Sequence, residues 1–112
     1  MTEPLFEIQT STADGALILA AAGEIDLATA PQLGDAIHAA NGVNRVVVDL
    51  SAVTFIDSSG LNALVHGQRS LADRDISLRV VSPTDKVVYK VFEMTRLTSQ
   101  LGIVDSLADA LS

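Results

Sequence analysis

The spacing of hydrophobic residues predicts a hairpin at the start of the chain. From Phe6 to Thr10 more apolar positions alternate with polar ones, and Asp14-Gly15 follows, a dipeptide favoured where a tight turn needs positive φ. From Ala16 to about Ile25 the chain is apolar on both faces until acidic residues appear at its end. The pattern indicates two antiparallel strands, the second of them inside a covered sheet.

Three later segments show the three- and four-residue spacing of amphipathic helices. The first follows a candidate capping residue, Thr29, and ends at Asn41-Gly42. The second follows the tetrapeptide Asp57-Ser58-Ser59-Gly60 and runs to about Ala72. The expected apolar stripe of the third helix consists of Val87, Val88, Val91, Phe92 and Met94.

Short apolar runs between these helices predict the remaining strands. Arg45 to Leu50 is rich in β-branched residues and suits the centre of the sheet, with Ser51 to Ile56 as a connecting stretch. Ile76 to Val81 and a short piece at Ile103-Val104 complete the strands, and Asp105 to Leu111 predicts a last helical turn or two. The expected fold is a single α/β domain over residues 1–112. Its mixed sheet opens with an antiparallel hairpin, continues with parallel strands and is packed by about four helices.

Charge and composition limit the classes of partner that the chain is expected to bind. The chain has 112 residues, with 14 acidic and 7 basic side chains and a formal net charge of −7. Such a charge repels the phosphates of nucleic acids and anionic lipids, so neither is an expected partner. The longest apolar run, Ala16 to Ala22, is far shorter than the roughly 20 residues that span a bilayer, and the N-terminus lacks the pattern of a secretory signal. We expect a cytoplasmic protein.

The chain offers little for metal or redox chemistry. It has no cysteine, which excludes disulfides and thiolate ligands within the chain, and only two histidines, His38 and His66. The histidines show no metal-binding spacing. We therefore expect no cofactor and no metal.

The most informative local chemistry is the tetrapeptide before the second helix. If Ser58 is the N-cap, Ser59 takes the first helical position, where free backbone N–H groups and the helix dipole attract anions. Gly60 beside it would leave the hydroxyl unshielded. A phosphate on Ser59 would add about 1.5 to 2 negative charges next to Asp57 and near Asp26, and a partner that fits a neutral hydroxyl would then bind weakly.

Local chemistry alone leaves a plainer interpretation open. Asp, Ser and Gly are common at strand-to-helix turns because they cap and turn, and Glu24 and Asp26 fit an ordinary solvated strand end.

Three segments of the sequence resemble the bacterial anti-sigma factor antagonists and the wider STAS family. They are Gly23-Glu24-Ile25-Asp26, Val46-Val47-Val48-Asp49-Leu50-Ser51 and Val53-Thr54-Phe55-Ile56-Asp57-Ser58-Ser59-Gly60-Leu61. The likeness in element order covers nearly the whole chain, and the Asp-Ser-Ser-Gly-Leu motif is the most specific part.

The resemblance implies a phosphorylation switch. In that family the second serine of the motif is phosphorylated, which corresponds to Ser59. The kinase is the anti-sigma factor, which the unphosphorylated antagonist binds so that a sigma factor is freed, and a serine phosphatase reverses the modification. Ser58 becomes the neighbouring cap. The expected partner-contacting residues are Asp26, Asp57, Ser58, Ser59, Gly60 and Asn62, while Leu61 and Val65 suit the core. The oligomeric state stays open between monomer and weak dimer.

Other functions compete with this one. A serine-nucleophile enzyme is disfavoured because Asp57 stands where a nucleophile elbow has glycine, and His66 lies about two helical turns beyond Ser59. A nucleotide- or small-ligand-binding STAS module has no phosphate-binding glycine loop to support it. A scaffold that is independent of phosphorylation also survives.

Overall fold

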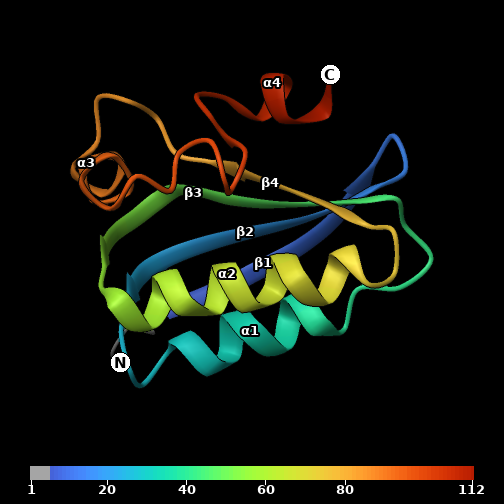
Figure 1. The fold of residues 1–112 in the computed structure, drawn as a ribbon, viewed down its shortest axis with the longest axis horizontal. Helices are drawn as coiled ribbons and strands as arrows, with labels where there is room; N and C mark the ends of the chain where they lie inside the picture. The colour runs from blue at the N-terminus through green and yellow to red at the C-terminus, as the bar shows by residue number, and fades with distance from the viewer. Residues whose placement is uncertain (1–5) are drawn as a thin grey trace.

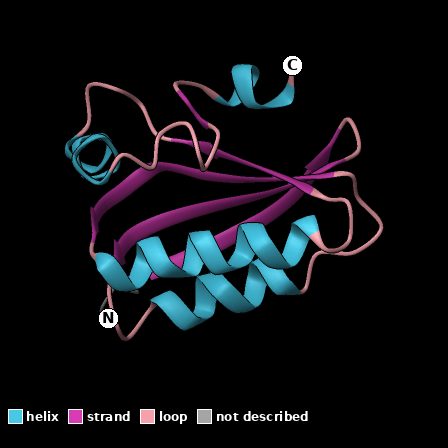
Figure 2. Cartoon of the chain, in the orientation of Figure 1, coloured by secondary structure: helices cyan, strands magenta, loops and turns pink. Residues whose placement is uncertain are grey.

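A five-stranded mixed sheet is the framework of the computed structural model, which describes residues 6–112 (Figures 1 and 2). The strands are β1 (Phe6–Ala13), β2 (Ala16–Ile25), β3 (Arg45–Ile56), β4 (Ser77–Val81) and β5 (Ile103–Val104). The helices are α1 (Ala30–His38), α2 (Ser58–Ala72), α3 (Val87–Thr95) and α4 (Leu107–Leu111). The strands lie in the order β1-β2-β3-β4-β5; β1 and β2 are antiparallel, and every later pair is parallel. The predicted fold class is confirmed.

The opening hairpin forms for the reason that its turn sequence suggests. Asp14 and Gly15 both have positive φ, at 53° and 78°, as a two-residue hairpin turn of type I′ requires. The turn joins Ala13 directly to its register partner Ala16.

The helices cover the two faces of the sheet unequally. Figure 1 shows α1 and α2 side by side against one face, α4 over the other, and α3 beside the carboxyl half of β3. The smaller cluster under α4 contains Ala16, Ile18, Val47, Val81 and Ala110. Alternate residues of β3 serve both faces, because Val46 and Val48 belong to the larger cluster under α1 and α2.

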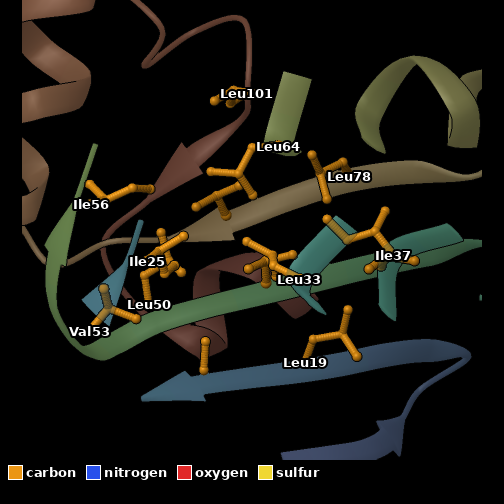
Figure 3. Packing of buried hydrophobic residues seen from close by; sticks show 14 of the residues in the cluster. Leu19, Ile25, Leu33, Ile37, Leu50, Val53, Ile56, Leu64, Leu78 and Leu101 are labelled. Carbon is orange, nitrogen blue, oxygen red and sulfur yellow. The ribbon is translucent and has the colours of Figure 1, made fainter. Parts of the chain in front are cut away.

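The larger cluster holds α1 and α2 in place. Leu33 and Ile37 of α1 and Leu64 of α2 are fully buried against Leu19 of β2 and Leu50 of β3 (Figure 3). Burying one such leucine or isoleucine contributes about 1.5–3 kcal/mol, so the two helices are firmly seated on this face. Their position matters for the site, since it fixes where α2 begins.

The central strand is longer than the sequence pattern predicts. The segment Ser51 to Ile56 is part of β3 and not a connection. Two register shifts against β2 interrupt the ladder, between Ala20 and Ala22 and between Gly23 and Glu24. These bulges break the strict alternation of apolar residues that would mark a regular strand, while β2 still supplies backbone partners as far as Ile25.

Helix α3 buries fewer of its apolar residues than predicted. Val88 and Phe92 are buried and Val91 is partly so, but Val87 and Met94 are 73% and 83% exposed. Val87 and Met94 are seven residues apart and so lie on nearly the same line of the helix, turned away from the line of Val88 and Phe92. Including them in the buried stripe was wrong.

Two glycines in the paired helices test how closely α1 and α2 pack. A Cβ added at Gly67 of α2 would lie 2.8 Å from Cγ2 of Ile37, whereas one added at Gly34 of α1 would meet nothing within 4 Å. We expect Gly67→Ala to destabilise the protein by about 1–2 kcal/mol, because overpacking exceeds the gain in helix propensity. Gly34→Ala should stabilise it by about 0.5–1 kcal/mol. Urea unfolding of both variants measures these changes. Equal changes in the free energy of unfolding would contradict the close packing of Gly67 on Ile37.

Candidate functional site

The N-terminus of α2 carries both candidate serines, but its cap is Asp57. The carboxylate oxygen Oδ1 of Asp57 accepts hydrogen bonds from the backbone N–H groups of Ser59 at 2.9 Å and Gly60 at 3.4 Å. Ser58 is therefore the first helical residue and Ser59 the second, so the prediction of Ser58 as the cap was wrong. The physical reason is that a carboxylate accepts N–H bonds more strongly than a neutral hydroxyl does.

The cap uses neither serine hydroxyl. Ser58 is exposed and Ser59 is half-buried. The hydrogen bonds at this turn of the described structure join Asp57 to the two backbone amides and use neither Oγ atom. A hydroxyl that holds no structural bond can be modified without unfolding the turn.

Gly60 packs closely against the sheet, a role that the sequence did not predict. The residue is buried, and an added Cβ would lie 2.6 Å from Cγ1 of Ile56 and 2.7 Å from Cγ2 of Ile25. Only glycine lets the first turn of α2 sit so closely on the ends of β2 and β3. Gly60 therefore fixes the depth at which Ser59 lies, and its own contribution to a partner contact is limited to backbone.

Asp26 and Asp57 leave the sheet side by side. Ile25 and Ile56 are register partners at the ends of β2 and β3, and the N–H of Asp57 donates to the carbonyl oxygen of Ile25 at 3.2 Å. Each aspartate follows its isoleucine directly. The two carboxylates thus start from adjacent strand ends, next to the helix turn that carries Ser59.

Asp26 also organises the turn into α1. Its Oδ1 accepts hydrogen bonds from the N–H groups of Ala28 at 3.0 Å and Thr29 at 3.2 Å. Thr29 occupies the predicted cap position of α1 but does not cap it with its side chain. Instead its hydroxyl donates to the carbonyl of Glu24 at 2.8 Å and accepts from the N–H of Asp26 at 2.9 Å. Asp26 is thereby held in one orientation.

Ser59 opens onto a groove between α1 and α2 that sequence reasoning missed. The groove has a volume of about 410 Å³, and its lining includes Leu27, Ala30, Gly34, His38, Ser59 and Asn62. Asn62 is exposed, one turn beyond Ser59 on α2, and Leu27 is 79% exposed. The small side chains of Ala30 and Gly34 leave room here. An isolated leucine in a predicted turn gave little signal, since single exposed apolar residues are common.

The two histidines lie in different settings on α1 and α2. The ring Nδ1 of His38 lies 3.0 Å from Oγ of Ser70, so that this contact links α1 to α2. His66 is exposed on α2, seven residues beyond Ser59 and hence about 10 Å along the helix axis. Within residues 6–112 no cluster of His, Cys, Asp or Glu could hold a metal ion. Nor does that part of the chain contain a helix long and apolar enough to cross a membrane.

Comparison with known proteins identifies relatives of this chain. The family model described as "Mlab, STAS domain" matches residues 8–105. An anti-sigma-B factor antagonist of Listeria monocytogenes is 33% identical over 84 residues, which cover 73% of each chain.

The chain belongs to the STAS-domain family of anti-sigma factor antagonists.

Further relatives extend the match to almost the full length. An anti-sigma-B factor antagonist of Staphylococcus aureus is 29% identical over 98 residues, covering 86% of this chain and 90% of the relative. The crystal structure of an anti-sigma factor antagonist from Mycobacterium paratuberculosis superposes with a TM-score of 0.86 at 31% identity, covering 99% of this chain and 96% of the other. The family resemblance inferred from the three sequence segments is confirmed.

The capping assignment makes a direct prediction. Asp57→Ala removes the acceptor for two backbone N–H groups and should lower the free energy of unfolding by about 1 kcal/mol. Ser58→Ala is the matched control and should change it by less than about 0.5 kcal/mol, because Ser58 is exposed and does not cap. Thermal and urea unfolding measure both changes. A larger loss of unfolding free energy in Ser58→Ala than in Asp57→Ala would show that Ser58 is the cap.

Proposed function

We propose that this STAS domain is an anti-sigma factor antagonist controlled by phosphorylation of Ser59. In its unphosphorylated form it binds an anti-sigma factor in the cytoplasm, and a sigma factor is released. The anti-sigma factor is itself the serine kinase that modifies Ser59, and a serine phosphatase restores the active form. The names of the curated relatives and the family membership support the antagonist role.

One observation carries the switch: within residues 6–112 the Ser59 hydroxyl makes no hydrogen bond and lies on a surface groove, while its own backbone N–H is already bound to Asp57. A phosphate on Oγ would therefore meet a carboxylate at the helix end where a helix normally offers free N–H donors. Asp26 starts from the adjacent strand end and adds a second negative charge. Phosphorylation would therefore change the charge of the site and leave its backbone conformation almost unchanged.

The size of the electrostatic effect is sufficient for a switch. Two unit charges about 4 Å apart interact by about 1 kcal/mol in bulk water and about 4 kcal/mol at the effective dielectric of a protein surface. A phosphoserine carries up to about two charges, and it would also have to lose water when a partner covers it. When a partner excludes water from the site, the repulsion between the phosphate and Asp57 rises from the first of these values toward the second. Since about 1.4 kcal/mol is a tenfold change in affinity, phosphorylation would weaken binding by one or more orders of magnitude.

The partner-contacting residues follow from the same geometry. Asp26, Asp57, Ser58, Ser59 and Asn62 are exposed or half-buried around one helix end, and a partner that reads the neutral hydroxyl would contact several of them together. Gly60 supports this surface from below.

The occupied helix end argues against the alternative of a nucleotide-binding module at this position. Asp57 Oδ1 takes the two backbone N–H groups that would otherwise hold a nucleotide phosphate, and it repels anions.

The proposal is tested by incubating the purified chain with the anti-sigma kinases of its host and ATP and locating the phosphate by mass spectrometry. We expect modification at Ser59, none in Ser59→Ala, and a fully folded Ser59→Ala variant that still binds the kinase. Calorimetric titration should show binding at least about tenfold weaker for Ser59→Glu. Ser58→Glu is the control for added charge, and its effect should be smaller because Ser58 is exposed and outside the groove lining.

Phosphate that lands consistently on another residue, or equal affinity of Ser59→Ala and Ser59→Glu, would refute the switch.

A further inference from the structure

The large apolar side chains that are exposed within residues 6–112 gather at one end of the molecule. They are Leu27 at 79%, Phe55 at 46%, Val87 at 73% and Met94 at 83% exposure. Figure 1 shows their elements along the left side of the view: α3, seen end-on, is at the top, the end of β3 and the start of α2 are in the middle, and the loop that leads into α1 is at the bottom. The opposite end, with the β1–β2 turn, has no such side chain among the described residues.

A second groove lies on the other side of the segment that carries Ser59. It has a volume of about 260 Å³ and is formed by residues 51–54 of β3 and residues 86–88 at the start of α3. β3 pairs with β4 only up to Asp49, so its edge beyond that point is open toward α3. The segment Thr54 to Ser59 therefore connects the two grooves, because Ser59 lines one together with Leu27, and Thr54 lines the other together with Val87.

Charge divides this end of the molecule into two halves. Glu24, Asp26 and Asp57 surround the exits of β2 and β3. On α3, Lys90 stands three residues after Val87 and four before Met94, which places it beside both on the helix surface. Lys86 lines the second groove, whereas the carboxylate of Glu93 lies further round the helix. An acidic half thus adjoins Ser59, whereas the half at α3 carries Lys86 and Lys90 beside its apolar side chains, with Asp85 and Glu93 also exposed there.

We propose that the anti-sigma factor docks across both halves, with Phe55, Val87 and Met94 as an apolar contact that does not depend on phosphorylation. The proposal rests on the proposed function and names the rest of that partner's binding surface. The partner would close over the neutral hydroxyl of Ser59, place apolar side chains against Val87 and Met94, and place a carboxylate opposite Lys90. A second copy of this chain is a poorer occupant, because each copy has a net charge of −7.

The two halves would contribute differently to binding. Clustered, exposed apolar side chains supply most of the affinity in many protein interfaces, and charged rims supply orientation. Contact at α3 would position the partner over Ser59 before the kinase acts. Phosphate at Ser59 would then weaken the acidic half and leave the α3 half unchanged.

The experiment uses the full chain and the anti-sigma factor that binds its unphosphorylated form. Val87→Ser combined with Met94→Gln removes apolar surface at two exposed positions, and we expect binding at least about fivefold weaker by calorimetry. Lys90→Glu should weaken binding to a similar degree. Arg79→Glu is the matched control, since it makes the same charge change on an exposed residue of β4 away from this end, and it should change affinity by less than about twofold. Circular dichroism melts confirm that all variants are folded.

The outcomes separate this proposal from the switch. If the α3 variants bind like the wild type while Ser59→Glu does not bind, the α3 docking surface is wrong and the switch stands. If Ser59→Glu binds like the wild type while the α3 variants are weakened, the docking surface stands and the switch is wrong. Sedimentation that shows a dimer, lost in the α3 variants, would assign the surface to a second copy and overturn the proposal.

Discussion

The close packing of Gly60 on Ile25 and Ile56 is the constraint from which the rest of the site follows. A residue with a Cβ at this position would overlap both isoleucine side chains, so the first turn of α2 can lie directly on the sheet only with glycine there. The same two isoleucines are register partners, and the N–H of Asp57 bonds across to the carbonyl of Ile25. The ends of two strands and the start of one helix are thereby locked into a single arrangement.

This arrangement explains why a change of charge can act without a change of fold. Asp57 caps α2 and Asp26 holds the turn into α1, so both carboxylates are fixed by backbone hydrogen bonds. Ser59 belongs to the same turn, and its hydroxyl makes no hydrogen bond to another described residue. Under the proposed switch, a phosphate there would add charge to a rigid surface, and a partner that fits the neutral surface would bind less tightly. The buried face of α1 and α2 supplies the rigidity.

The general architecture could be predicted because the relevant signals are local. Asp14-Gly15 specified its turn, and the β-branched run at residues 46–48 specified a central strand. The carboxyl half of β3 could not be predicted, because two bulges erase its alternation and its backbone partners come from β2, far away in the sequence. The exposure of Val87 and Met94 was missed for a related reason: the apolar residues of α3 spread over more of the helix than the core can cover.

The candidate site was predicted in part. The motif pointed to Ser59, but the choice of cap between Asp57 and Ser58 depends on which acceptor reaches the amides of Ser59 and Gly60, and spacing alone does not decide that. The role of Gly60 depends on Ile25, which reaches it only through strand pairing. The groove beside Ser59 needs two helices at a particular distance. The motif therefore could not reveal the roles of residues that act through contacts distant in sequence.

The most direct test of a local switch on a rigid scaffold is an amide NMR spectrum of the chain before and after phosphorylation by the anti-sigma kinase, recorded with the affinity of each form. We predict that shifts will be confined to the first turns of α2 and the neighbouring turn between β2 and α1, and that binding will be lost. Shifts spread through β4, β5 and α4, or unchanged binding after complete phosphorylation of Ser59, would contradict the account.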